Sequence, residues 1–177
     1  MLPRRGQRSF PYSCRNPFSG GWRLDPLLRQ VLPEGAEAVV AKPASGFSHD
    51  PVGELAAQTA PRLLEKYSGR ALIILTGACA VHCRYCFRRH YPYETNPRER
   101  PAWDAAVQQI ASDPSVTEVI LSGGDPLTLV DESLEKLSDA LATIPHVRRL
   151  RVHSRLPIMI PSRINASLLS WLSGGPW

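Results

Sequence analysis

Three cysteines lie on one short segment directly after an apolar run, and this placement limits the folds open to the chain. Cys79, Cys83 and Cys86 are spaced C-x3-C-x2-C, and the apolar run predicts a buried strand over residues 71–76. The cysteines therefore occupy the loop after a strand, which is where βα folds collect their catalytic groups.

The number of cysteines indicates what this loop binds. Three thiolates can hold three irons of a cubane cluster and leave the fourth iron open, whereas a cluster used only for electron transfer normally takes four cysteines. The spacing therefore predicts a [4Fe-4S] cluster with one open iron.

Zinc is the main alternative for the same residues, because His82 and His90 lie close by in the sequence. Structural zinc sites usually show two paired ligand knuckles. This chain has one, and its other cysteine, Cys14, lies far upstream. Buried inert thiols are a further alternative. Disulfides are not expected, because no apolar signal segment is seen and a reducing cytoplasm is the predicted location.

Apolar runs alternate with amphipathic stretches after residue 70. Strands are predicted over 71–76, 116–121 and 147–153, and helices over 102–112, around Leu134–Ile144 and after Asn165, which is expected to cap the last helix. Strands that alternate with helices imply an α/β fold whose parallel sheet is covered on its faces.

The preceding region predicts short helices. Asp25-Pro26 and Asp50-Pro51 each read as an N-cap followed by a first-turn proline. A further short helix is expected to carry Leu63 and Leu64.

The net charge of +5 comes from the first 24 residues, which hold five arginines and no acidic residue. Basic and acidic residues balance in the rest of the chain, so it offers no net basic field for a nucleic acid. No run of about eighteen apolar residues occurs, so no membrane span is predicted. The Arg-rich start is compatible with a transit peptide, but its prolines and glycines disfavour an amphipathic helix. A disordered or aberrant leader is the prediction.

Several separate motifs together resemble the radical S-adenosylmethionine (SAM) enzymes and, within them, the lysine 2,3-aminomutase family. These motifs are Cys83–His90, Ser122–Pro126 and His153–Pro157, and they fall in the order of that family. Asp25–Pro33 and Cys86–Pro92 look most like the bacterial branch that isomerises lysine before its attachment to elongation factor P. The resemblance covers roughly residues 25 to 172.

The resemblance implies the amino-terminal half of a partial (βα)6 radical SAM barrel, preceded by short helices. The expected parts are an atypical leader at 1–24, an extension at 25–70 and the first three βα units at 71–177. In the family, the second half of the barrel supplies the remaining strands and a lysine that binds pyridoxal 5′-phosphate (PLP). None of the three lysines of this chain matches it, so an inactive fragment that folds poorly is expected.

The resemblance also assigns roles to residues. Cys79, Cys83 and Cys86 would bind the cluster. The segment Gly123, Gly124 and Asp125 would hold SAM, and the alternative is a simple strand-to-helix turn.

Arg88 would pair with the carboxylate of the substrate, and the alternative is a solvated arginine. Lys66, Tyr67 and Arg70 would hold the PLP phosphate, and the alternative is a solvated helix end. The roles of His153 and Arg155 stay open.

The implied function is an isomerase that converts (S)-α-lysine to β-lysine for the modification of elongation factor P, using the [4Fe-4S] cluster, SAM and PLP. The implied partners are free lysine, an electron donor such as a flavodoxin, and the ligase that acts on elongation factor P. The alternatives are a non-catalytic iron–sulfur or zinc-binding fragment and a radical SAM aminomutase of another amino acid.

Overall fold

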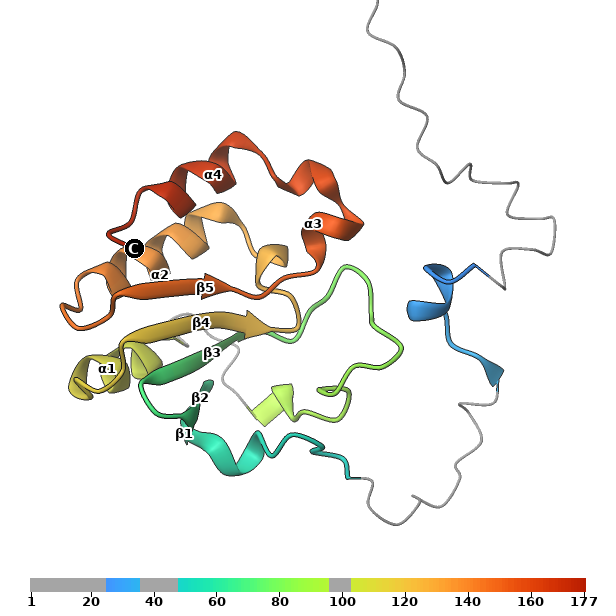
Figure 1. Cartoon of the computed structure of the whole chain (residues 1–177), viewed down its shortest axis with the longest axis horizontal. Helices are drawn as coiled ribbons and strands as arrows, with labels where there is room; N and C mark the ends of the chain where they lie inside the picture. The colour runs from blue at the N-terminus through green and yellow to red at the C-terminus, as the bar shows by residue number, and fades with distance from the viewer. Residues whose placement is uncertain (1–24, 36–47, 96–102) are drawn as a thin grey trace, which may run out of the picture. The chain divides into compact units, whose positions relative to one another are not determined.

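The computed structural model describes residues 25–35, 48–95 and 103–177 (Figure 1). The chain divides into two compact units. The smaller comprises residues 1–41 with 83–85, and the larger comprises 42–82 with 86–177. The predicted leader at 1–24 lies outside the described residues.

Among its described residues, the smaller unit contains the short 3-10 helix Leu28–Gln30. The Asp25 carboxylate accepts hydrogen bonds from the backbone N–H groups of Leu27 and Leu28, at 2.8 and 3.1 Å. The helix itself begins at Leu28 with Leu27 as its N-cap residue, so the predicted N-cap at Asp25 is wrong by two residues. The Asp25 carboxylate still satisfies two backbone donors at the start of this turn. In the same unit, Arg84 pairs with Glu34 at 3.2 Å.

The larger unit is built on a five-stranded sheet with the strand order β1-β2-β3-β4-β5 (Figure 1). Strands β1 to β3 pair antiparallel, and β3 to β5 pair parallel. The strands are β1 (Gln58–Ala60), β2 (Leu63–Tyr67), β3 (Arg70–Thr76), β4 (Glu118–Gly123) and β5 (Arg149–Val152). The three predicted parallel strands are thus confirmed, within two residues at their ends.

Helices connect and cover the parallel strands. They are α1 (Asp104–Ser112), α2 (Asp131–Ala142), α3 (Leu156–Met159) and α4 (Ala166–Ser173). Short 3-10 helices lie at Leu55–Ala57, Tyr93–Thr95, Pro126–Thr128 and Pro161–Arg163. The predicted cap of the last helix is confirmed, because the Asn165 side chain accepts a hydrogen bond from the Leu168 N–H at 2.9 Å. Among the described residues, no helix is long and apolar enough to cross a membrane.

One face of the sheet packs against the helices and forms the core. Every second residue of a strand points to this face, so Ile73 of β3 and Leu121 of β4 share one cluster with Ile110 of α1, Leu134 of α2 and Leu168 of α4. All five side chains are fully buried. Burial of this apolar surface is the main favourable term that holds the helices on the sheet.

The solvent exposure of the opposite face of the sheet changes along the strands. Near their carboxyl ends it is buried, with Ile74, Ile120 and Ser122 almost inaccessible to solvent. Near their amino ends it carries exposed arginines, including Arg70 and Arg149. The carboxyl ends therefore provide the sheltered part of this face.

The helix predicted around Leu63 and Leu64 is wrong, because these residues begin strand β2. Leu63 pairs with Ile73 of β3, and both side chains are buried. The two-residue turn Ser68-Gly69 joins β2 to β3, with Gly69 at φ +74°. Glycine adopts such backbone angles readily, and hairpin turns of two residues require them. Hydrogen bonding to β3 thus decides the structure of this segment, although the two consecutive leucines would also fit a short helix.

Candidate cofactor site at the carboxyl ends of the parallel strands

The carboxyl ends of β3 and β4 bring two predicted site segments together. Strand β3 ends at Thr76, directly before the cysteine loop, and β4 ends at Gly123, the first residue of the Gly-Gly-Asp segment. The two strands are adjacent and parallel, so both loops leave the same edge of the sheet.

Backbone contacts lock the Gly-Gly-Asp segment to the start of the cysteine loop. The Gly124 N–H donates to the Thr76 carbonyl at 2.6 Å, and the Asp125 N–H donates to the Ala78 carbonyl at 2.8 Å. A Cβ on Gly124 would lie 2.3 Å from the Ala78 carbonyl oxygen. Glycine is therefore required here because two backbone segments are in direct contact.

Gly123 is required for a second reason. Its φ is +129°, and a Cβ there would lie 2.4 Å from the Thr76 carbonyl oxygen. Other residues rarely adopt this backbone conformation. The glycine pair thus serves the packing of the two loops, and its predicted contact with SAM stays a prediction.

Asp125 joins the loop after β4 to the loop after β5. This residue is buried, with 6% of its surface exposed. One carboxylate oxygen accepts from the Leu127 N–H at 3.0 Å and from the Ser154 hydroxyl at 2.7 Å. The other accepts from the N–H groups of Arg155 and Leu156 at 2.8 and 3.0 Å. Both oxygens are engaged within the protein, so Asp125 orders the loops, and a contact with SAM stays a prediction.

The three cysteines are distributed over both compact units. Cys79 and Cys86 belong to the larger unit and Cys83 to the smaller. Cys86 is exposed, and the other two are partly exposed. In the part of the chain that the structure describes, no three His, Cys, Asp or Glu side chains are arranged to hold a metal ion. Three accessible thiols on one short loop are the donor set that an iron–sulfur cluster takes.

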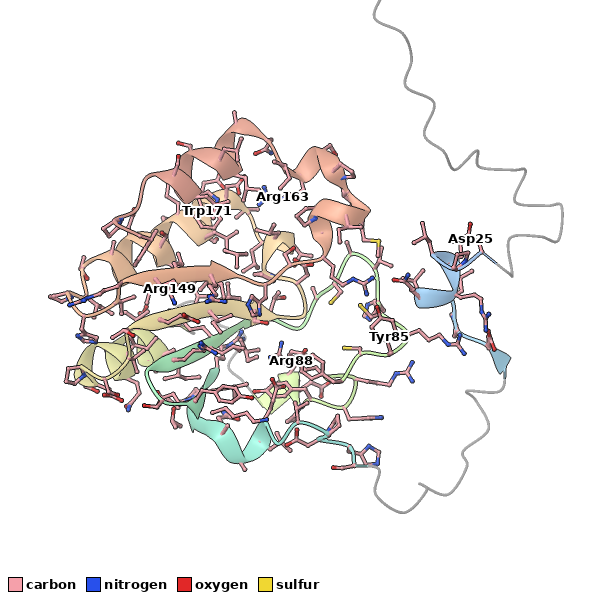
Figure 2. All side chains as sticks on the ribbon, in the orientation of Figure 1. Asp25, Tyr85, Arg88, Arg149, Arg163 and Trp171 are labelled. Atoms are coloured by element: carbon pink, nitrogen blue, oxygen red, sulfur yellow. The ribbon has the colours of Figure 1, made fainter. Side chains whose placement is uncertain are left out.

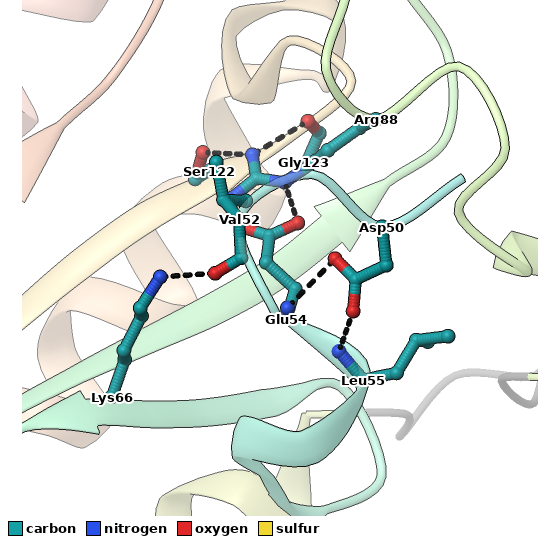
Figure 3. Close-up of polar contacts among 8 residues, drawn as sticks. All are labelled: Asp50, Val52, Glu54, Leu55, Lys66, Arg88, Ser122 and Gly123. Atoms are coloured by element: carbon teal, nitrogen blue, oxygen red, sulfur yellow. Dashed lines mark hydrogen bonds and ion pairs between the residues drawn. The ribbon is translucent and has the colours of Figure 1, made fainter. Parts of the chain in front are cut away.

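Arg88 is buried beside the end of β4, with 8% of its surface exposed. Its Nε and Nη2 donate to the two carboxylate oxygens of Glu54, at 2.7 and 2.5 Å. Its Nη1 donates to the Ser122 hydroxyl at 2.9 Å and to the Gly123 carbonyl at 3.1 Å (Figure 3). The solvated alternative for Arg88 is therefore wrong, and its predicted contact with a substrate stays a prediction.

Glu54 is the main residue of this region that sequence reasoning missed. It is 8% exposed, and its backbone N–H donates to the Asp50 carboxylate at 2.8 Å. The Leu55 N–H donates to the other oxygen of Asp50 at 2.9 Å (Figure 3). These two backbone hydrogen bonds lower the pKa of Asp50. The Asp50-Pro51 signal located this turn, but nothing in the sequence pointed from Glu54 to Arg88.

The three residues assigned to the PLP phosphate lie together at the β2–β3 hairpin. Lys66 Nζ and Arg70 Cζ each lie 5.9 Å from the centre of the Tyr67 ring, and Lys66 donates to the Val52 carbonyl. The alternative of a helix end is wrong, because the segment is a hairpin. Two cations beside a tyrosine suit a phosphate. Arg70 begins β3, whose seven residues separate it by about 20 Å from the cysteine loop.

A charged cluster lies at the same amino-terminal edge of the sheet. Glu118 of β4 contacts the guanidinium groups of Arg70, Arg149 and Arg151 at 2.7, 2.8 and 3.2 Å. The hydrogen bond from Arg149, labelled in Figure 2, is the main cause that lowers the pKa of Glu118. This cluster was not anticipated from the sequence.

At the other end of β5, burial lowers the pKa of His153, with a further contribution from Arg151.

Comparison with known families identifies the domain that contains both loops. Residues 68–151 match the family described as a 4Fe-4S single cluster domain. The matched region includes all three cysteines and the Gly-Gly-Asp segment. The cluster inferred from the cysteine spacing therefore agrees with an independent comparison.

Curated relatives match most of the chain. It is 50% identical over 145 residues to an L-lysine 2,3-aminomutase of Escherichia coli (strain K12), covering 82% of this chain and 41% of the relative. It is 46% identical over 149 residues to the Haemophilus influenzae enzyme of the same name, covering 84% and 43%. It is 36% identical over 151 residues to the one from Clostridium subterminale, covering 84% and 35%.

The chain thus spans about two fifths of the length of the first two of these relatives. A match over 82% or more of the chain includes the cysteine loop, strands β3 and β4 and the Gly-Gly-Asp segment. Over most of its own length, the chain is therefore similar to the lysine 2,3-aminomutases.

Proposed function

We propose that this chain carries the cluster-binding and SAM-binding part of a radical SAM isomerase of the lysine 2,3-aminomutase type. The observation that carries the proposal is the direct backbone contact between the cysteine loop and the Gly-Gly-Asp segment, through Gly124 and Asp125. A cluster held by the first loop would lie next to any ligand held by the second. The family match over residues 68–151 supports the same assignment.

Each part of the site has a defined task in this proposal. The thiolates of Cys79, Cys83 and Cys86 hold the cluster, and the backbone at Gly123 and Gly124 lines the place for SAM. Held there and reduced, the cluster and SAM would supply the radical chemistry that removes a hydrogen atom from the substrate. The protein itself positions these groups, and Asp125 does so by joining the loops after β4 and β5.

The residues proposed for the substrate and those proposed for PLP lie at opposite ends of the parallel strands. Arg88 lies at the carboxyl ends of the strands, where it suits a substrate carboxylate that would share the guanidinium with Glu54. Lys66, Tyr67 and Arg70 lie at the hairpin and suit a phosphate. We propose free lysine as the substrate and β-lysine as the product, because the relatives named above carry lysine in their names.

Three finer points belong to the same proposal. The β-lysine would serve the modification of elongation factor P through its ligase, and the electron would come from a donor such as a flavodoxin, in the cytoplasm. Residues 71–177 would form the first three βα units and 25–70 an extension before them. Since no lysine of this chain matches the PLP-binding lysine of the family, the chain alone would not make β-lysine.

A product assay tests the proposal. After anaerobic reconstitution with iron and sulfide, followed by reduction, the chain is expected to convert SAM to 5′-deoxyadenosine, which chromatography and mass spectrometry detect. Cys83→Ser is expected to abolish this product, because a ligand of the cluster is lost. Formation of equal amounts of 5′-deoxyadenosine by Cys83→Ser and the unaltered chain would contradict the proposal.

A further inference from the structure

The ion pair of Glu54 and Arg88 joins the segment before the sheet to the segment after the third cysteine. We propose that Glu54 is a positioning residue that holds Arg88 and, through it, residues 86–93 against the end of β4. The consequence for SAM binding rests on the function proposed above, whereas the consequence for the order of residues 86–93 does not.

The geometry of the pair favours a fixed arrangement. Both carboxylate oxygens of Glu54 face the same edge of the Arg88 guanidinium, at 2.7 and 2.5 Å, and both side chains are buried. A two-point contact of this kind fixes the plane of the guanidinium as well as its position. Because burial removes water as a competing partner, Glu54 is the group that balances the charge of Arg88.

Glu54 is itself held in place from the upstream side. The two oxygens of Asp50 accept the backbone N–H groups of Glu54 and Leu55 (Figure 3). This turn is followed directly by the 3-10 helix Leu55–Ala57 and strand β1. The carboxylate of Glu54 is therefore presented by a backbone that the sheet anchors.

Arg88 transmits this anchoring to the cysteine loop and to β4. Its Nη1 contacts the Ser122 hydroxyl and the Gly123 carbonyl, which directly precede Gly124. Arg88 lies two residues after Cys86, and the Tyr91 N–H donates to the Arg88 carbonyl at 3.1 Å. A displacement of Arg88 would therefore move both the third cysteine and the turn that follows it.

Glu54→Gln provides the sharpest test, because glutamine keeps the shape of glutamate but removes the charge and one of the two acceptor oxygens that Arg88 uses. The matched control is Asp131→Asn. Asp131 accepts a two-point contact from Arg163, at 2.6 and 3.1 Å, and both side chains are 14% exposed. Figure 2 labels Arg163 and Trp171, which contact Asp131 on the helical side of the sheet.

Hydrogen exchange of the full chain without cofactors, followed by mass spectrometry, measures the order of residues 86–93. We expect exchange there to accelerate about tenfold or more in Glu54→Gln and to stay unchanged in Asp131→Asn. Ser122→Ala removes only one contact of Nη1, and a smaller acceleration in the same segment is expected. Unchanged exchange at 86–93 in both Glu54→Gln and Ser122→Ala would overturn the proposal.

SAM binding to the reconstituted chain provides the second readout. Glu54→Gln is expected to retain less iron, because Cys86 lies in the displaced segment, and to bind SAM about tenfold more weakly when binding is counted per cluster. Asp131→Asn is expected to match the unaltered chain in both measurements. Equal SAM affinity of Glu54→Gln and the unaltered chain would overturn the positioning role. If the unaltered chain itself bound no SAM, the function proposed above would fail, and hydrogen exchange would still decide the role of Glu54.

Discussion

Arg88→Ala is expected to lower the free energy of unfolding by about 3–5 kcal/mol, because it leaves the buried carboxylate of Glu54 without its partner. The loss is a large part of the stability of an ordinary domain, which is roughly 5–15 kcal/mol. Chemical denaturation monitored by circular dichroism measures the change.

A double-mutant cycle separates the pair from the rest of the structure. Glu54→Ala alone is expected to be similarly destabilising, since it leaves a buried guanidinium uncompensated. The double variant should lose less than the sum of the two single variants, because it leaves neither charge behind. Additive losses in the cycle would show that Glu54 and Arg88 act independently and would contradict their buried coupling.

Gly124→Ala is the second change with a large expected effect. The added Cβ would lie 2.3 Å from the Ala78 carbonyl oxygen, and 2.8 Å from two backbone carbons of the cysteine loop. The clashing atoms of the cysteine loop belong to its backbone and cannot rotate away as a side chain would, so one of the two loops must shift. We expect a cost of roughly 1–3 kcal/mol, as for other overpacked sites, together with a loss of iron retention after reconstitution.

Gly35→Ala is the matched control, because nothing lies within 4 Å of its added Cβ. Its stability and iron content are expected to equal those of the unaltered chain. Thermal unfolding and iron analysis compare the two variants. A Gly124→Ala protein as stable and as rich in iron as Gly35→Ala would show that the contact between the two loops is not needed.

The parallel strands and their helices were predictable because their signals are local. The stretch over 71–76 is almost wholly apolar, and the apolar residues of α1 and α2 recur at the helical period. The hairpin of β2 and β3 was not predictable in this way. Leu63 and Leu64 are consecutive apolar residues, a pattern that fits a short helix and a buried strand equally well, and only pairing with β3 decides between them.

The contacts inside the site could not be predicted from the sequence. The glycine pair predicted a close approach of backbone to a ligand, and the structure shows a close approach to Ala78. Asp125 was assigned to SAM, yet its oxygens accept four hydrogen bonds from the protein. The partnership of Glu54 with Arg88 joins residues 34 positions apart. Such long-range pairs depend on the finished fold, which no local pattern describes.

We propose above that Cys79, Cys83 and Cys86 bind a [4Fe-4S] cluster whose open iron takes SAM. Electron paramagnetic resonance of the reconstituted and reduced chain, recorded with and without SAM, tests it most directly. We expect a cluster signal that SAM alters and that Cys83→Ser abolishes. Zinc without iron in protein purified under anaerobic conditions, or a cluster signal that SAM leaves unchanged, would contradict it.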